Sequence, residues 1–465
     1  MHSSSGMPVM ETFDETLSTE AGSTVFCGFF FLYIRLLFIC PIVLNWARVT
    51  EHDTKSKSIE MSIFAPNLQF ESKILMNQGR YIFSQLCDFL PTDHFKWLVK
   101  KYDGNKYVKS FTCWNHLLVL IFGQLSNREG LRDLIVSLSP FKSAFHHLGF
   151  GKSVTRSNLS KANEIRELRI FKDFADKMVT IARQKREGVK DFFISNKVYA
   201  FDSSTISLCL SVFWWTKLHH GKGGVKLHEL YDVKTNIPAF SIVTDASLHD
   251  SKVMDQIPYE KDSFYIFDRA YMVTDMLYLI HKKEAFFVVR EKHKMVFKVV
   301  SDKSYNNPAT GVMADQMIMF TGYKTKSNYS EALRRVVFYD KEGNRTFVFY
   351  TNNLQITAEE VALLYKFRWR CELFFKWLKQ HLRIKEFYGT SENAVKIQIY
   401  VAIIAYCLVA IAQSDMGLNI DTYDVLRILN VSLLTRMPLV DLFNEASKNE
   451  EEDKRYVQLS LDFAD

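Results

Sequence analysis

A run of polar residues between positions 365 and 379 recurs at helical spacing and could carry out chemistry. On a helix these residues would fall within an arc of about 60°, and an apolar side would lie opposite. One carboxylate among several cations is typical of a metal ligand whose neighbours hold phosphates. The polar arc comprises Tyr365, Arg368, Glu372 and Lys379, with Lys376 and Arg383 on or beside it. The expected core side comprises Leu363, Phe367, Cys371, Phe374 and Leu378.

A simpler interpretation of the arc is an ion pair within one helix. Arg368 and Glu372 are four residues apart, where such a pair contributes only about 0.2–0.5 kcal/mol. The two interpretations differ in whether other carboxylates reach the same place.

Two further carboxylates follow apolar runs that read as buried strands. Asp202 follows Val198–Phe201, and Asp268 follows Ser263–Phe267. Functional groups of open α/β sheets collect at the carboxyl ends of strands, although an Asp there is often only a turn or cap residue. Joined by Glu372, the two would offer hard oxygen ligands for Mg²⁺ or Mn²⁺. Two such ions about 3.5–4 Å apart can activate an attacking oxygen and stabilise a leaving one.

The elements that must position these residues follow from changes in hydrophobic period. Residues 76–190 are expected to be mainly helical, and 191–290 to begin an α/β layer of three neighbouring strands followed by alternating strand and helix. Residues 291–351 are expected to form a β-rich insertion, and 352–447 to complete the layer. A second predicted strand spans Ile206–Trp215, and the apolar run Val395–Ala412 is expected to be a core helix.

Within the first region, a hydroxyl cap precedes a short basic helix near residues 153–166. This helix could read base edges or could be an ordinary surface helix. The residues that would read bases are Arg156, Asn158, Lys161 and Asn163.

The ends of the chain differ from this body. Val25–Leu44 is apolar and long enough to span a bilayer. We interpret residues 1–75 as an atypical extension, which could be a membrane anchor, a buried helix, or translation from upstream of a start at Met61 or Met76. Residues 448–465 are expected to be a charged tail.

Composition narrows the function class. The formal net charge of +7 favours a polyanionic partner, and the seven cysteines show no CxxC pair, so they indicate neither a zinc site nor a disulfide framework.

His249-Asp250-Ser251 could support a metal site or cap a helix. The segment 219–226 could follow a DNA backbone or be a solvated hairpin, and its glycines lack the context of a nucleotide-binding loop.

The spacing Tyr365-x2-Arg368-x3-Glu372-x6-Lys379 resembles the YREK motif of the IS4-family transposases. Phe-Asp202-Ser-Ser-Thr and Phe-Asp268-Arg-Ala-Tyr are similar to the sites of that family's first two acids. The segments 76–85 and 149–160 resemble Bacteroides-type members, and the resemblance covers about residues 76–440.

The resemblance implies an RNase H-like catalytic core, a β insertion and a helical N-terminal DNA-binding domain. It also implies cut-and-paste transposition of an insertion sequence, by metal-dependent cleavage at terminal inverted repeats and strand transfer. Asp202, Asp268 and Glu372 would be catalytic and would bind the metal, two Mg²⁺ or Mn²⁺ ions. The residues that would contact DNA phosphates are Tyr365, Arg368, Lys379, Lys376, Arg156 and Lys161.

The implied partners are double-stranded DNA, as transposon ends and target, and a second copy of the chain on paired ends. The implied location is the bacterial cytoplasm, at the nucleoid. The chain departs from the family in one respect: residues 291–351 hold no Trp to stack on a flipped base, so Phe320 or Tyr323 would have to supply the ring. A degenerate DNA-binding copy, a membrane-anchored protein of other function and a stand-alone nuclease remain alternatives.

Overall fold

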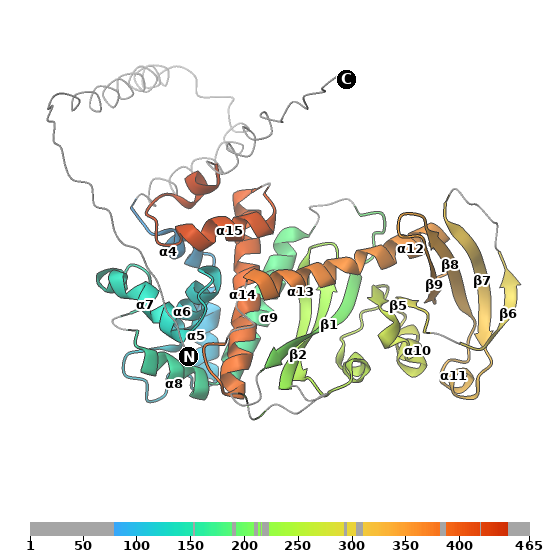
Figure 1. Ribbon diagram of the computed structural model, residues 1–465, viewed down its shortest axis with the longest axis horizontal. Coiled ribbons are helices and arrows are strands. Elements are labelled where there is room, and N and C mark those ends of the chain that lie inside the picture. Colours follow the sequence, from blue (N-terminus) through green and yellow to red (C-terminus); the bar gives the residue numbers. More distant parts are fainter. Residues whose placement is uncertain are drawn as a thin grey trace, which may run out of the picture. The chain divides into compact units, whose positions relative to one another are not determined.

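The computed structural model describes ten stretches of the chain (Figure 1), and the fold is drawn from them. The predicted extension with its apolar segment 25–44, positions 219–222, Arg383 and the predicted tail lie outside the described residues. The described residues are 79–151, 154–187, 192–208, 213, 215, 223–292, 295–303, 310–381, 387–418 and 420–444.

The part before the sheet is helical, as the sequence predicts. Helix α6 begins with a capping box, in which the Thr112 hydroxyl accepts from the Asn115 backbone N–H. The predicted break at Gly149 and Gly151 is present, and both glycines have positive φ. The helices are α4 (Ile82–Cys87), α5 (Thr92–Lys101), α6 (Cys113–Leu125), α7 (Leu131–Leu138), η2 (Ser139–Ala144), α8 (Arg156–Ile165) and α9 (Leu168–Arg186).

The described strands form one mixed sheet of nine in the order β3-β2-β1-β4-β5-β9-β8-β7-β6. The first three strands are antiparallel neighbours, and β4 and β5 are parallel to β1. This confirms the α/β class. The strands are β1 (Val198–Leu208), β2 (Gly223–Asp232), β3 (Ile237–Asp245), β4 (Phe264–Phe267), β5 (Phe286–Arg290), β6 (Phe297–Asp302), β7 (Val312–Phe320), β8 (Leu333–Asp340) and β9 (Arg345–Thr351).

Strand β1 is longer than the sequence predicts. The prediction of a strand ending before Asp202 and another from Ile206 is wrong, because residues 198–208 are continuous. The polar stretch after Phe201 stays extended because β2 pairs with it residue by residue, from Asp202↔Glu229 to Leu208↔Gly223. Hydrogen bonding to a neighbouring strand thus overrides the turn-like composition of this stretch.

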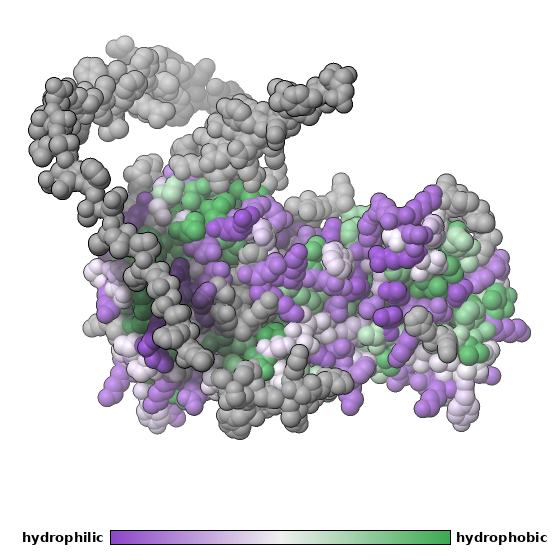
Figure 2. All heavy atoms as spheres, viewed as in Figure 1, coloured by the Kyte–Doolittle hydropathy of each residue, from purple (hydrophilic) through white to green (hydrophobic). Residues whose placement is uncertain are grey.

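Strands β6–β9 lie in the region expected to be a β insertion. They continue the same sheet, because β9 pairs antiparallel with β5. Figure 2 shows hydrophilic residues over α12 and the nearby ends of β8 and β9, and hydrophobic ones toward β6 and β7. Exposed apolar side chains on these two outer strands are Val299, Val300, Met313 and Met319. The predicted boundaries at 190, 290 and 351 stay predictions.

The predicted helix over 365–379 is two helices, α12 (Ala358–Phe367) and α13 (Trp369–His381), which meet at Arg368. The turn tightens there, since the Arg368 N–H bonds to Tyr365 O and the Cys371 N–H bonds to Arg368 O. Arg368 keeps helical dihedral angles, so the polar arc survives the junction. Leu363, expected in the core, is exposed.

Helix α14 (Glu392–Met416) contains the predicted core helix and joins the helical part before the sheet to the sheet itself. Among the described helices it alone is long and apolar enough to cross a membrane, but 94% of its apolar window is buried inside the protein. It packs on α9, α6 and α15 (Thr422–Ser432), while α9 packs on β3. The helical part and one face of the sheet therefore share a hydrophobic core. Helices α10 (Thr274–Lys282) and α11 (Tyr323–Asn328) lie by the second hydrophobic core, on the other face of the sheet.

A glycine in α6 allows this core to close. A Cβ at Gly123 would lie 2.8 Å from the Tyr388 hydroxyl oxygen and 3.1 Å from Leu134 Cδ2, and Tyr388 is buried. We expect Gly123→Val to lower the free energy of unfolding by about 2–3 kcal/mol, as overpacked cores do. Urea unfolding would measure it, with Gly130→Ala as the control, because Gly130 has open space around it. Equal stability of the two variants would contradict this packing.

Candidate active site

Strand register brings the two predicted aspartates to the same end of neighbouring strands. The last parallel pair between β1 and β4 is Phe201↔Phe267, so Asp202 and Asp268 follow at the same level. Asp268 then directly precedes η4 (Arg269–Tyr271), while Asp202 lies within β1. The apolar runs before both residues are buried in the sheet, which fixes the backbone that carries the two carboxylates.

Glu372 reaches this place from α13, which packs on β1 and β2. The Arg368 guanidinium joins it to Asp202: Nη1 donates to Asp202 Oδ2 at 2.7 Å and Nη2 donates to Glu372 Oε1 at 2.5 Å. The Arg368 side chain is only 12% exposed. The pair between Arg368 and Glu372 therefore exists, but the same guanidinium also binds a carboxylate from the sheet, so an isolated intrahelical pair does not describe it.

Tyr365 orients the third carboxylate. Its hydroxyl donates to Asp268 Oδ1 at 3.0 Å, and its ring lies 4.7 Å from the ring of Phe349 in β9. Burial raises the pKa of Tyr365 to about 12, so the phenol remains a proton donor at neutral pH. The structure thus brings Tyr365, Arg368 and the three carboxylates into one cluster.

The carboxylates interact electrostatically as well. Burial raises the pKa of Asp202 from 3.8 to about 6, and repulsion from Glu372 and Asp268 adds to the rise. The Arg368 charge and the Ser203 backbone N–H oppose it. The pKa of Asp202 therefore stays raised beside a guanidinium chiefly because burial disfavours its charged form.

A cavity of about 400 Å³ opens beside the cluster. Two carboxylates, two hydroxyls and two lysines line this cavity. The lysines suit a phosphate group that lies next to the carboxylates. Its lining residues are Asp202, Ser203, Ser204, Glu372, Phe375, Lys376, Lys379 and Gln380. The predicted phosphate-binding residues Lys376 and Lys379 therefore lie beside two of the three carboxylates.

The donor set fits a hard divalent cation, because it consists of carboxylate oxygens. A cation bound there would also stabilise the charged form of Asp202, which burial disfavours. Among the described residues, no three acidic, His or Cys side chains already stand in a metal-binding arrangement. Arg368, bonded to both Asp202 and Glu372, supplies positive charge to the two carboxylates.

The predicted base-reading residues on α8 have different surroundings. Arg156, Asn158 and Lys161 are exposed, and the Thr155 hydroxyl caps the helix by accepting from the Asn158 N–H. Asn163 is buried and bonds to His116 and to Tyr388 O, so it cannot reach a base. The burial pattern of a short helix was not readable from its polar sequence. None of these residues lines the cavity beside Asp202.

The segment His249-Asp250-Ser251, predicted either to support a metal site or to cap a helix, contributes one residue to each of these roles. Lys226 Nζ lies 2.8 Å from Asp250 Oδ1, and the Ser203 hydroxyl donates to the same oxygen at 2.8 Å. The adjacent His249 is a cap, since its ring accepts from the Ser251 N–H at the start of η3 (Asp250–Gln256). Asp250 therefore steadies the residue beside Asp202. The pairing of Lys226 with Asp250 was not predicted, and a lysine within the buried strand β2 was the available signal.

The two candidate aromatic residues of the insertion differ in access. Phe320 is buried, whereas the Tyr323 side chain is 94% exposed at the start of α11. Only Tyr323 presents a ring to solvent.

The raised pKa of Asp202 carries a stability cost. A carboxyl whose pKa is higher in the folded state loses stability as the pH rises from about 4 to about 6, and a shift of about 2 units corresponds to about 3 kcal/mol. We expect Asp202→Asn to be about 2–3 kcal/mol more stable than the parent protein at neutral pH without divalent cations. Thermal unfolding in chelator would measure the difference, which should shrink as the pH falls below 6.

Added Mg²⁺ or Mn²⁺ should raise the melting temperature of the parent protein and not that of Asp202→Asn. Asp255→Asn is the matched control, because Asp255 is exposed in η3. A parent protein that is as stable as Asp202→Asn in chelator would show that burial does not penalise this charge.

Comparisons with known proteins identify the domain that contains this site. Residues 195–408, which include all three carboxylates, match the family described as "Transposase DDE domain", and residues 78–151 match a domain of unknown function, DUF4372. The putative transposase y4zB of Sinorhizobium fredii is 35% identical over 216 residues, which are 46% of this chain and 59% of that protein. The probable transposase for insertion sequence element IS5377 of Geobacillus stearothermophilus is 29% identical over 49% of this chain and 60% of that protein.

The putative transposase for insertion sequence element IS4SA of Synechocystis sp. is 24% identical over 66% of this chain and 87% of that protein. The chain spans about 60% of the length of the first two relatives. With the mixed sheet and the helical N-terminal part, these matches confirm the prediction at the level of the domain: the chain carries a transposase DDE domain and is similar to the transposases of insertion sequences.

Proposed function

We propose that the protein is a DNA transposase that cuts at the terminal inverted repeats of an insertion sequence and joins the freed 3′ ends to target DNA. The observation that carries the proposal is the convergence of Asp202, Asp268 and Glu372 at one end of β1 and β4, with Tyr365 and Arg368 bonded among them. The family match covers the same residues and favours the same chemistry.

In this proposal Asp202, Asp268 and Glu372 hold Mg²⁺ or Mn²⁺, most simply as two ions. When bound, such cations activate water and stabilise the leaving oxygen of a phosphodiester. The chain's own residues align the reactants. Lys376 and Lys379, which line the cavity beside Asp202 and Glu372, hold phosphate oxygens on the strand to be cut.

Tyr365 and Arg368 act on the carboxylates as well as on DNA. Tyr365 donates a hydrogen bond that orients Asp268, and the Arg368 fork keeps Asp202 and Glu372 together before DNA arrives. A planar guanidinium suits this task, because it can bind two oxygens from different residues at once. Both residues remain within reach of a phosphate placed at the carboxylates.

The partners follow from this chemistry. Double-stranded DNA is the substrate as transposon end and as target, and Arg156 and Lys161 on the exposed side of α8 contact phosphates of the transposon end. Cutting two ends of one element requires a pair of active sites, which favours a homodimer on paired ends. The protein would act where bacterial DNA lies, in the cytoplasm at the nucleoid.

Removing any of the three carboxylates should abolish strand cleavage. We expect Asp202→Ala, Asp268→Ala and Glu372→Ala to reduce Mg²⁺-dependent cleavage of the element's terminal repeats by more than about a hundredfold, beyond the loss typical of an outer-shell partner. Gel analysis of end-labelled DNA would measure cleavage, and binding of the same DNA should persist. Asp255→Ala is the matched control. Undiminished cleavage in all three variants would exclude this assignment.

Arg368 should not tolerate replacement by lysine. A single ammonium cannot donate to Asp202 and Glu372 in the geometry of the guanidinium fork, so we expect Arg368→Lys to lower the cleavage rate by about 10–100-fold. The matched control is Arg345→Lys, where an exposed arginine pairs with Asp340 alone. Rates measured at saturating DNA would separate this effect from weaker binding, and parent-like rates would show that the fork is dispensable.

A further inference from the structure

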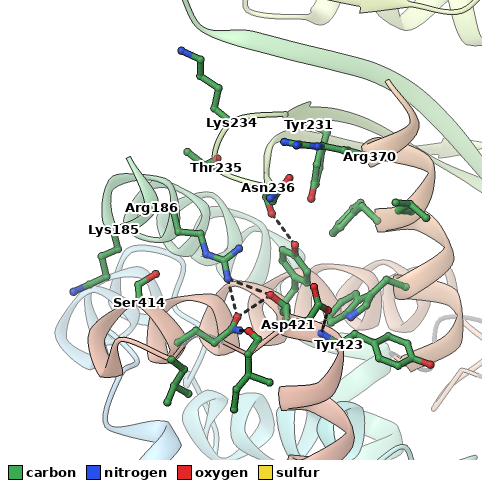
Figure 3. Close-up of a pocket in the computed structure, with 18 of the residues that line it drawn as sticks. Lys185, Arg186, Tyr231, Lys234, Thr235, Asn236, Arg370, Ser414, Asp421 and Tyr423 are labelled. Carbon is green, nitrogen blue, oxygen red and sulfur yellow. Dashed lines mark hydrogen bonds between the residues drawn. The ribbon is translucent and has the colours of Figure 1, made fainter. Parts of the chain in front are cut away.

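A second cavity of about 980 Å³ lies on the other side of α13 from the carboxylate cluster. It is bounded by the end of α9, the turn between β2 and β3, the end of α14 and the start of α15 (Figure 3). The cations on its lining are Lys185, Arg186, Lys234, Arg370 and Lys376. The single acidic residue among its lining residues is Asp421, whose carboxylate caps α15 by accepting from the Tyr423 N–H.

Three of these cations have neutral hydrogen-bond partners in the part of the chain that the structure describes. Arg370 Nη1 donates to Val233 O at 2.6 Å, and Lys234 Nζ donates to Ser195 O at 2.8 Å. Arg186 donates to the side-chain oxygens of Gln413 and Thr422. Lys185 forms an ion pair with Asp415.

Burial leaves part of this charge poorly solvated. It lowers the pKa of the Arg370 guanidinium and of the Lys234 ammonium, so both charged forms are less favourable there than in water. Asp232 offsets part of this effect at Lys234, but its carboxylate is also paired with Arg183 at 3.0 Å. An anion entering the cavity would be stabilised by several cations at once.

The two cavities share part of their lining. Lys376 and Gln380 border both of them, because these residues lie on the edge of α13 between its two faces. A chain of phosphates that passes Asp202 and Glu372 can therefore continue past Lys376 toward Arg370. The exposed side chains of Leu373 and Tyr423 add apolar surface beside the cations, as in sites that hold nucleic acid strands.

We propose that this basic cavity binds the phosphodiester backbone of DNA that continues from the strand held at the carboxylates. The inference rests on the proposed function for the location of the strand, and it adds a binding site that the three carboxylates and the YREK residues do not supply. The shared chemistry is the phosphodiester, whether the continuing segment is duplex or single-stranded.

The test uses the full-length protein without divalent cations, so that cleavage does not enter the measurement. Lys234→Gln and Arg370→Gln border only this cavity. Each should weaken binding of a fluorescent duplex with a single-stranded 3′ extension by about three- to tenfold, measured by anisotropy. Lys283→Gln, an exposed lysine after α10, is the matched control and should leave affinity unchanged.

The salt dependence of binding identifies the segment. Loss of one phosphate contact should reduce the slope of log K against log salt by about 0.9 for duplex DNA and by about 0.7 for a single strand. A blunt duplex and a free single strand, measured in parallel, distinguish the two sources. Thermal unfolding confirms that each variant is folded, and Lys185→Gln provides a second substitution if Arg370→Gln unfolds.

Unchanged affinity and unchanged salt slope in folded Lys234→Gln and Arg370→Gln would overturn the inference. It would also be overturned if inorganic phosphate competed with the fluorescent DNA as well as unlabelled DNA of the same phosphate concentration does. These outcomes are separate from failure of the proposed function. A protein that binds DNA through the cavity but never cuts it would retain this site and lose the assigned activity. A protein that cuts DNA with parent-like affinity in both variants would lose only the site.

Discussion

The Arg368 guanidinium between Asp202 and Glu372 is the interaction on which the rest of the site depends. Three carboxylates gather at one end of β1 and β4, and burial, with a smaller contribution from mutual repulsion, keeps the pKa of Asp202 high even beside that cation. Such a cluster costs stability unless positive charge is brought to it. Tyr365 stabilises the Asp268 carboxylate by donating a hydrogen bond to it. Buried carboxylate oxygens are also ligands that divalent cations prefer, so the cost of burying Asp202 and the proposed metal binding have the same origin.

The position of this guanidinium is set by apolar packing elsewhere on α13. Phe374 contacts the ring of Tyr231 in β2 at 5.2 Å between centroids, and Trp377 contacts Tyr406 in α14 at 4.5 Å. These contacts fix the rotation of the helix, and hence which of its sides looks toward Asp202. Because α14 is buried and also packs on α9 and α6, the helical part before the sheet contributes to the orientation of the side chains in the carboxylate cluster. The site is therefore held by one core, although its residues come from distant parts of the sequence.

The sequence was sufficient to predict the site where the chemistry of the residues and their helical or strand spacing indicate the same element. The spacing of Tyr365, Arg368 and Glu372 predicted their common side, and the apolar runs before the two aspartates predicted the strands that carry them. Features that depend on contacts with other elements of the chain were not predictable from the sequence. Strand β1 runs through its polar stretch because β2 pairs with it, and Asn163 is buried because His116 and Tyr388 take its hydrogen bonds. The exposure of Leu363 likewise depends on which neighbours α12 meets, which periodicity does not specify.

Helix α13 presents polar residues to two cavities, and this accounts for a polar surface that exceeds the four residues of the motif. Glu372 and Lys379 border the carboxylate cavity, Arg370 borders the basic cavity, and Lys376 borders both. If Arg370 served only the fold, a carboxylate would be its expected partner, since a half-buried cation is best stabilised by an opposite charge. It donates to a backbone carbonyl instead, with further cations across the same cavity. Gathered positive charge of this kind raises the free energy of the isolated protein and would be offset further by a bound polyanion, which favours the proposal that the second side of α13 serves DNA rather than the core.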